Sequence, residues 1–534
     1  MSQTRDFIII GGGHNGLVTA FYLARAGKKV LVLERRGTVG GAAITDEFHP
    51  GFKVSTLAHI SGPLHPGVAN DMRLASHGLE MLHSKARIFA PHPDGRALLL
   101  HTDPARSCES IAAFSKKDAE AYGRFDDTLG RIAGALSGIQ TIIPPSIDSP
   151  SAGDLWNLLG LGKKIRGLGT KDTQRLLRWG PMAVADLVAE YFETELLRAA
   201  IAARGIFGTF LGPWSAGSST VLLLRAVGDP HLAGTVAFPS GGMGALTQAM
   251  AKAALKAGAE IRTGADVDRI RVQNGRATGV VLAGGEEISG GTVVSNADPK
   301  RTLLSFVEPI HLGPDFLSRM RNFRAVGTTA KVNLALSGLP QFTALKKASG
   351  VAGGDGHLAL SGRIHIGPEI DYLERAFDHA KYGEYSSRPY LDVMIPSIAD
   401  PSLVPSGKHV MSINMQYAPY KLKSGDWAAH REALGKSVID TLAAYAPNLP
   451  GLIEHSQVIT PADLESEYGL TGGHIFHGEM ALDQIFTMRP LLGWARYNTP
   501  IEGLYLCGAG THPGGGVTGA PGANAARAIL KDRR

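Results

Sequence analysis

The sequence predicts an α/β protein with more than one domain, and three observations support this prediction. First, 534 residues, of which 44% are hydrophobic, suffice for two or more domains that each bury a core. Second, the chain begins with a strand, a glycine-rich turn, a helix and a second strand. Third, residues 300–470 alternate strand-like runs with loops.

The N-terminal unit is the stretch on which the other predictions depend. Residues 7–10 form a short apolar run closed by glycines, which indicates a buried parallel strand. Gly11, Gly13 and Gly16 then fit the spacing G-x-G-x-x-G. The first glycine permits a tight turn, the second lets the backbone approach a pyrophosphate, and the third lets the next helix pack closely on the strand. That helix, which ends at Gly27, offers the free N–H groups of its first turn to phosphates.

A second strand, residues 30–33, ends in Glu34, about 20 residues beyond the glycines. A carboxylate at this place accepts hydrogen bonds from a ribose, suits a free 2′-hydroxyl and would repel a 2′-phosphate. An ordinary glycine-rich loop is the alternative. Because strand, glycines, helix, strand and acid occur in register, we predict a Rossmann-type dinucleotide-binding domain, in which His14 shapes the phosphate turn.

Composition argues against several function classes. The net charge of +6 arises from 54 basic and 48 acidic residues, which is mild for this length and does not favour nucleic-acid binding. Cys108 and Cys507 are the two cysteines and form no C-x-x-C, which argues against a disulfide framework, dithiol chemistry or a cysteine metal cluster. The histidines of residues 44–105 lack the spacing of a zinc site, so we predict no metal.

The ends of the chain and its hydropathy bear on localisation. The first strand begins by Phe7, which leaves no room for a signal or transit peptide ahead of it. No stretch reaches the roughly 18 apolar residues of a membrane-spanning helix. The expectation is an intracellular, cytoplasmic protein, and the sequence leaves open a homo-oligomer or a protein partner.

Residues 155–179 combine apolar side chains, two tryptophans and six basic residues. A basic amphipathic stretch of this kind can lie on a membrane surface, so peripheral membrane contact is one interpretation. The alternative, which we favour, is a helical cap whose apolar face packs on the domain below and whose basic residues face water. Gly160, Gly162 and Gly167 weaken any long continuous helix here.

Domain organisation follows from the order of the patterns. We predict a discontinuous dinucleotide-binding domain made of residues 1–105, 236–300 and 471–534. Residues 106–235 look mainly helical and form a cap, and residues 301–470 form an antiparallel sheet; cap and sheet together are the substrate domain.

Within the substrate domain, the alternation from Lys331 to Leu336 fits a half-buried antiparallel strand. Residues 427–445 read as a helix stopped by prolines. The runs that we expect to form the strands of this sheet are residues 328–336, 357–365, 390–395 and 409–416.

The C-terminal segment returns to the nucleotide-binding domain. Residues 503–506 read as a strand that runs into Gly508, followed by the glycines 514–516 and a helix over residues 523–530. A glycine turn ahead of a final helix directs a second helix N-terminus at a polar group.

These motifs resemble a known family. With the glycine doublet Gly40–Gly41 just after the acid, their order is similar to that of the flavin-containing oxidoreductases that include carotenoid desaturases and amine oxidases. The segments 13–17, 474–479 and 511–516 resemble one subgroup, the pyridine nucleotide-disulphide oxidoreductase domain-containing protein 2 group, which is close to the phytoene-desaturase-like proteins. The resemblance covers essentially the whole chain and implies FAD rather than NAD, although the absence of C-x-x-C excludes disulphide chemistry.

The resemblance also implies roles for particular residues. The backbone of Val267 contacts adenine, Gly508 lies near the ribityl phosphate, and residues 517–519 face the isoalloxazine, where a positive helix end stabilises an anionic reduced flavin. Together with the motif residues, the expected cofactor-binding set is Gly11, Gly13, His14, Asn15, Gly16, Glu34, Arg35, Gly41, Ala42, Val267, Asn296, Gly508, Val517, Thr518 and Gly519.

The implied activity is an FAD-dependent dehydrogenase or desaturase that takes a hydride from a small hydrophobic, isoprenoid-like substrate. FAD accepts a hydride without a protein nucleophile, so the protein must position the C–H bond, exclude water and move protons. Candidate catalytic acids and bases are His477, Glu479 and His512. Each has an alternative role: His477 is a core histidine, Glu479 is a cap or surface residue, and His512 serves the cofactor alone.

Two other functions remain open at this stage. A flavin amine oxidase requires an aromatic pair at the flavin face, for which Trp494 and Tyr497 are the candidates. A flavoprotein with a mainly regulatory role, whose function is protein interaction, is the other alternative.

Overall fold

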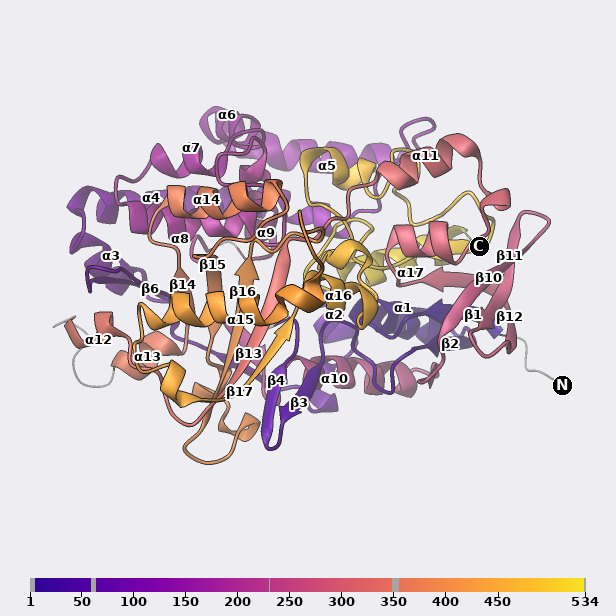
Figure 1. Cartoon of the computed structure of the whole chain (residues 1–534). Helices are drawn as coiled ribbons and strands as arrows, with labels where there is room; N and C mark the ends of the chain where they lie inside the picture. Colours follow the sequence, from indigo (N-terminus) through magenta and orange to yellow (C-terminus); the bar gives the residue numbers. More distant parts are fainter. Residues whose placement is uncertain (1–4, 59–63, 230, 348–354, 533–534) are drawn as a thin grey trace.

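The computed structural model describes residues 5–58, 64–229, 231–347 and 355–532, and two seven-stranded sheets organise it. The first sheet has the order β10-β11-β12-β1-β2-β9, with β18 paired to β12. Its strands come from three distant parts of the chain and lie together on the right of Figure 1. Their bounds are β1 Arg5–Ile10, β2 Val30–Leu33, β9 Glu260–Arg262, β10 Val267–Gln273, β11 Arg276–Leu282, β12 Glu287–Ser295 and β18 Leu504–Leu506.

Strand β1 is the centre of this sheet and pairs in parallel with both β2 and β12. Helices α1 (His14–Arg25), α10 (Met243–Lys256) and α17 (Ala520–Asp532) pack beside one another over the sheet and share one apolar core. Phe7 and Ile9 of β1 face this core, and Ile8 and Ile10 face a second apolar core on the opposite side of the sheet. Both faces of β1 are therefore covered, which explains its continuous apolar run. The α/β class and the discontinuous Rossmann-type domain predicted from the sequence are confirmed.

The second sheet has the order β17-β13-β16-β15-β14-β6-β7 and lies on the left of Figure 1. Its pairs are antiparallel except β14–β6, which is parallel. Helix α15 (Trp427–Ala443) packs on its lower part. The strands are β6 Ala86–Pro91, β7 Ala97–His101, β13 Thr329–Leu336, β14 Arg363–Ile366, β15 Tyr390–Met394, β16 His409–Gln416 and β17 Ile453–Ile459.

Three details of the second sheet correct the sequence predictions. Residues 86–101 belong to this sheet, so the N-terminal part of the nucleotide-binding domain does not extend to residue 105; the partner of β6 lies more than 200 residues away, and no local pattern reveals such a pairing. Residues 357–365 are not one strand, because α13 (Asp355–Leu360) precedes β14. All of β13 is buried rather than half-buried, because polar residues on its second face lie against a cavity and other elements.

A helical layer covers the other face of the second sheet. Its core includes Ile88 and Leu98 of the sheet and Phe125 and Leu197 of the helices. The helices are α3 Pro104–Ala112, α4 Lys116–Leu136, α5 Ala152–Gly167, α6 Gly169–Trp179, α7 Val184–Ala189, α8 Glu195–Ile206, α9 Ser218–Gly228 and α14 Ile370–Lys381.

Small elements join the two sheets. The hairpin of β3 (Thr45–His49) and β4 (Phe52–Ser55) contacts both α10 and β16, and β5 pairs with β8. Further short helices and strands are α2 Pro66–Asp71, β5 Met81–His83, β8 Ala237–Pro239, α11 Pro314–Asn322, α12 Thr343–Lys347 and α16 Pro461–Ser466.

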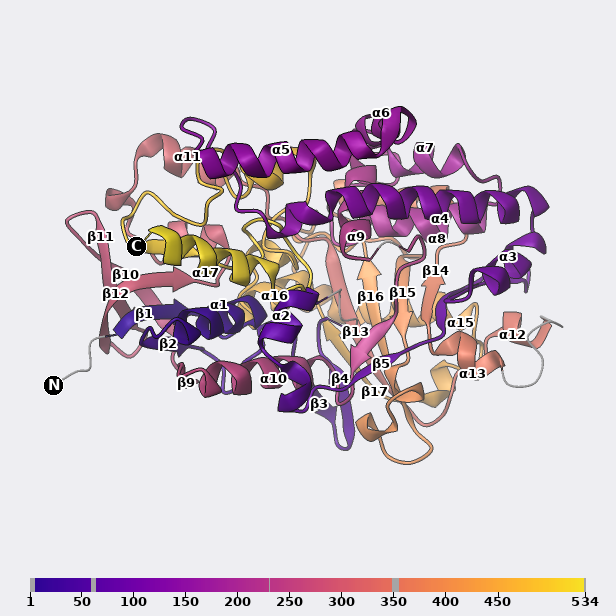
Figure 2. The same ribbon diagram turned by 180° about the vertical axis from the view of Figure 1, so that it is seen from behind.

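Helix α5 lies along the upper edge of the molecule in Figure 2. Asp154 is its one buried residue, capped by Ser151 and paired with Arg496 at 3.0 Å. Trp156 is 74% exposed and Leu159 64% exposed, so the expectation that the apolar face of residues 155–179 packs on the domain below is wrong for α5. In α6, by contrast, Trp179 is 1% exposed and packs into the core of the helical layer, with Leu176 against it. Within the described ranges, no helix combines the length and apolarity needed to cross a bilayer.

Candidate active site

A cavity of about 1010 Å³ extends from the carboxyl ends of β1 and β2 to the second sheet. One end is lined by the glycine turn after β1, by Glu34 and by Asn296, which directly follows β12. The other end is lined by side chains of the helical layer, such as Leu224 of α9, and by side chains of the second sheet, such as Asn414 of β16. Since single ligand pockets measure about 300–1,000 Å³, this volume suits a large cofactor together with a substrate.

Two glycine segments form the wall of the first end. A Cβ on Gly13 would lie 2.7 Å from Asn296 Nδ2, and one on Gly16 would lie 2.3 Å from the Gly11 carbonyl oxygen. The Gly40 amide donates to the Gly12 carbonyl at 2.9 Å, so the doublet lies directly against the first turn. The result is a backbone surface without side chains at the N-terminus of α1, which suits a pyrophosphate.

Glu34 is fixed at the edge of this surface. The side chain is 6% exposed, and its two oxygens accept hydrogen bonds from the amides of Gly12 and Arg36 at 2.8 and 2.9 Å. Each carboxylate oxygen retains a second lone pair, so the held carboxylate can still accept hydrogen bonds from ribose hydroxyls.

Polar atoms without partners show what this wall can bind. A buried polar atom that lacks a hydrogen bond is costly, so such a group in a cavity indicates a polar ligand. Guanidinium groups suit phosphate oxygens in particular. Among the described residues, the unpartnered buried atoms in cavity-lining side chains include His14 Nε2, Asn15 Oδ1, Arg36 Nη1, Arg301 Nε, His477 Nδ1 and His512 Nδ1.

The predicted cofactor-binding residues divide into two groups. Gly16, Gly508 and Gly519 lie behind the wall and allow close packing; a Cβ on Gly508, for example, would be 2.7 Å from the Asn296 carbonyl oxygen. The residues of the predicted set that line the cavity are Gly11, Gly13, His14, Asn15, Glu34, Arg35, Gly41, Ala42, Val267, Asn296, Val517 and Thr518.

Two arginines that line the nucleotide end of the cavity are absent from the predicted set. Arg36 lies over the Tyr468 ring, 5.0 Å from its centroid, and its position two residues after the acid was a signal that could have been used. Arg301 comes from the segment after β12, and no motif marks it.

His477 and His512 line the cavity, whereas Glu479 does not. Burial lowers the pKa of both histidines to about 4, so both imidazoles are neutral at pH 7. His512 Nε2 hydrogen-bonds the Ile139 carbonyl at 2.7 Å, which leaves Nδ1 as an acceptor. Glu479 accepts from the Phe210 amide at 2.9 Å and lies 3.8 Å from His474 Nε2, a geometry that favours a structural role.

Arg489 holds the segment that carries His477. Its guanidinium is fully buried and donates hydrogen bonds to five backbone carbonyls. The two nearest belong to Ala509, at 2.8 Å, and Phe476, at 2.9 Å. The other carbonyl acceptors are those of Gly478, Glu479 and Gln484.

The aromatic pair proposed for an amine oxidase does not line the cavity. Tyr497 is fully buried and donates to the His512 carbonyl at 2.8 Å. Trp494 packs edge-on against Phe316, with ring centroids 5.7 Å apart. Both side chains therefore pack into the protein, and that assignment is wrong.

A Rossmann-type sheet, a glycine wall for a pyrophosphate and a cavity shared with a second domain define a dinucleotide-binding protein. Residues 16–530 match the family described as flavin containing amine oxidoreductase. The chain belongs to this family.

Individual relatives agree with this assignment. The chain is 37% identical to the rat protein named pyridine nucleotide-disulfide oxidoreductase domain-containing protein 2, over 99% of this chain and 93% of the relative. It is 28% identical to a limonene dehydrogenase subunit of Castellaniella defragrans, over 100% and 96%. It is 27% identical to the neurosporene-forming phytoene desaturase of Cereibacter sphaeroides, over 96% and 92%.

The crystal structure of an oxidoreductase from Methanosarcina mazei has the same fold, with a TM-score of 0.61, 16% identity, and coverage of 98% of this chain and 100% of that one. The predicted resemblance and the predicted FAD cofactor are confirmed. The protein is an FAD-dependent oxidoreductase. Its two cysteines, Cys108 and Cys507, are both free thiols.

Replacing Glu34 tests the placement of the cofactor. Glu34→Arg removes the ribose acceptor and both backbone contacts, so we expect the purified variant to bind FAD at least tenfold more weakly. Flavin absorbance per mole of protein and titration with added FAD measure this. Glu432→Arg, an exposed change on α15, is the control. Wild-type flavin content in Glu34→Arg would show that the ribose lies elsewhere.

The lowered histidine pKa values predict acid sensitivity. Because folded His512 titrates near 4 and an unfolded histidine near 6.5, the unfolded state binds the extra proton between these values, and stability falls as pH falls. We expect His512 to account for about 2 kcal/mol of the loss between pH 7 and pH 5. His512→Gln keeps a donor for Ile139, so its melting temperature should fall less over this interval. Parallel pH profiles of the two proteins would contradict this.

Proposed function

We propose that this protein is a dehydrogenase or desaturase that removes a hydride from a C–H bond of a hydrophobic substrate. The observation that carries the proposal is the apolar lining of the cavity between the nucleotide wall and the floor of the second sheet. It continues directly from the nucleotide wall and includes Leu136, Ile139, Leu161, Val221 and Leu224. The names of two relatives, a limonene dehydrogenase subunit and a phytoene desaturase, support an isoprenoid-like substrate.

The side chains of the protein position the substrate, exclude water and accept protons. Its apolar side chains exclude water and hold the substrate body, while bound FAD supplies the hydride acceptor. His477 Nδ1 and His512 Nδ1 are unpartnered within the described ranges and neutral at pH 7, so each can accept a proton from the substrate. Arg489 fixes the loop of the first histidine.

Anaerobic bleaching of the flavin tests this function. Terpenes, terpene alcohols and medium-chain acids should bleach the bound flavin, whereas matched amines should not. Leu224→Trp fills the apolar part of the cavity, so this variant should show a flavin-bleaching rate at least tenfold lower with its flavin content unchanged. Leu255→Trp, on the exposed side of α10, is the control.

If only amines bleach the flavin, the protein is an amine oxidase and not a dehydrogenase or desaturase of the proposed kind. A flavin that photoreduces, resists every substrate and co-purifies with a partner protein would favour the regulatory alternative.

We also propose that α5 contacts an anionic membrane surface, through which a hydrophobic substrate reaches the cavity. Leu155, Trp156 and Leu159 are exposed on this helix, which also carries the exposed bases Lys163 and Lys164. Apolar and cationic groups on one surface helix suit the interface of a bilayer with anionic lipids. The same helix contributes Leu161 to the cavity lining, which connects this surface with the site.

Vesicle sedimentation tests the membrane contact. The wild type should sediment with vesicles of phosphatidylcholine and phosphatidylserine, and less with phosphatidylcholine alone. Trp156→Ser combined with Leu159→Ser should reduce binding at least fivefold, while Leu255→Ser, which removes an exposed apolar side chain on α10, should have no effect. Equal binding of all three proteins would show that another surface is responsible.

A further inference from the structure

The second end of the cavity carries a row of polar side chains on the floor of the second sheet. Lys331 of β13 lies opposite Asn414 of β16, and Asn414 lies opposite Asp392 of β15. Arg363 of β14 continues the row and pairs with Asp392, with Nε and Nη2 each 3.1 Å from a carboxylate oxygen. All four side chains line the cavity and are at most 8% exposed.

Two arginines of the helical layer also line this end. Arg204 of α8 is 4% exposed, donates to the Leu232 carbonyl at 2.9 Å and lies 3.7 Å from Asp229. Arg225 of α9 is different, because no carboxylate among the described residues pairs with it. Its contacts are the Phe207 carbonyl at 3.4 Å and the face of the Phe207 ring at 4.7 Å.

The charges at this end do not balance. Asp392 forms an ion pair with Arg363, and Asp229 lies 3.7 Å from Arg204, whereas no carboxylate among the described residues lies within ion-pair distance of Arg225; Asp392 acts on Arg225 only at longer range. Burial lowers the pKa of Arg225 to about 9, so the guanidinium still carries its charge at neutral pH. Burial also lowers the pKa of Lys331 well below its ordinary value, while Asp392 acts in the opposite direction, and the amine adds a hydrogen-bonding group beside Arg225. The Arg225 side chain is half-buried and faces the cavity; a guanidinium held partly away from water without a paired carboxylate is costly, and an anionic ligand removes that cost.

Arg225 also lies close to the C-terminal glycine turn. Its guanidinium is 5.8 Å from the centroid of the Phe476 ring. That ring packs on Gly515, where a Cβ would be 2.1 Å from Phe476 Cδ1. A group bound at Arg225 is therefore separated from the turn before α17 by one aromatic ring.

We infer that the substrate carries an anionic head group, a carboxylate or a phosphate ester, which Arg225 binds with Lys331 and Arg363 beside it. The apolar body of the substrate then lies along Leu224 and Val221. This inference rests on the proposed function, since it assigns the second end of the cavity to the substrate. The site would therefore prefer an amphipathic acid. A neutral hydrocarbon would leave the charge of Arg225 without a counter-ion, and a protonated amine would be repelled.

Calorimetric titration of the FAD-loaded enzyme with four probes of one chain length tests the inference. Octanoate or octyl phosphate should bind at least tenfold more tightly than octanol, and octylamine should not bind. The tighter of the two anions identifies the head group. Equal affinity for octanol, or tighter binding of octylamine, would overturn the inference.

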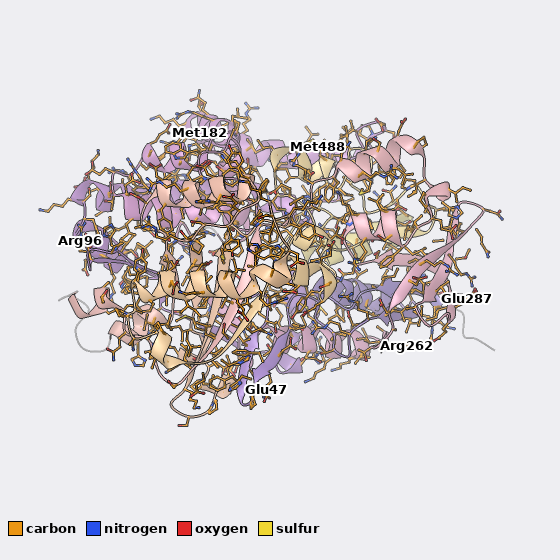
Figure 3. All side chains as sticks on the ribbon, viewed as in Figure 1. Glu47, Arg96, Met182, Arg262, Glu287 and Met488 are labelled. Carbon is orange, nitrogen blue, oxygen red and sulfur yellow. The ribbon has the colours of Figure 1, made fainter. Side chains whose placement is uncertain are left out.

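Variants locate the anion. Arg225→Gln should weaken binding of the preferred anion at least tenfold and leave octanol binding unchanged. Arg262→Gln, which removes an exposed guanidinium at the rim of the first sheet (Figure 3), should change neither. Unchanged anion affinity in Arg225→Gln would overturn the assignment. If this variant does not fold, the comparison of probes on the wild type decides.

The titration requires no turnover, so it is independent of the proposed reaction. A protein that selects octanoate yet never bleaches keeps the anion site and loses the proposed function. A protein that bleaches with neutral terpenes and shows no preference among the probes keeps the function and loses the anion site.

Discussion

The active site depends on one buried guanidinium. Arg489 donates to carbonyls on both sides of the cavity wall, in residues 476–484 and at Ala509. Hydrogen bonds from charged groups contribute about 1.5–3 kcal/mol each, and removal of the donor would leave several buried carbonyls unpaired. Phe476, which separates Arg225 from the glycine turn, and His477, which faces the cavity, are positioned by this one side chain.

Charge distribution gives the two ends of the cavity different chemistry. At the nucleotide end, arginines face a backbone surface without side chains, and Glu34 is held by amides. At the far end, two acid–base pairs share the floor and roof with Arg225, whose charge has no carboxylate paired with it among the described residues. Long apolar walls lie between them. The cavity therefore has a polar binding region at each end and an apolar region between them.

The sequence revealed the nucleotide end well because its signals are local. Strand, glycine spacing and Glu34 all lie between residues 7 and 34, and each of these features has its own steric or hydrogen-bonding reason. The far end arises from register between strands that lie far apart in the chain, as Lys331, Asn414 and Asp392 show. Likewise, β6 pairs with β14 without any local sign, and Arg489 acts through backbone carbonyls, which leave no trace in residue type.

The first sheet has a consequence for synthesis of the protein. Its central strand β1 is synthesised well before β18 and α17, which complete the wall around the glycine turn. A nascent chain can therefore pair β1 with β2 early, but it cannot enclose the cofactor until β18 and α17 have been made. Until then the apolar surface of α1 that α17 later covers remains open, so capture of the cofactor depends on the synthesis of these two elements.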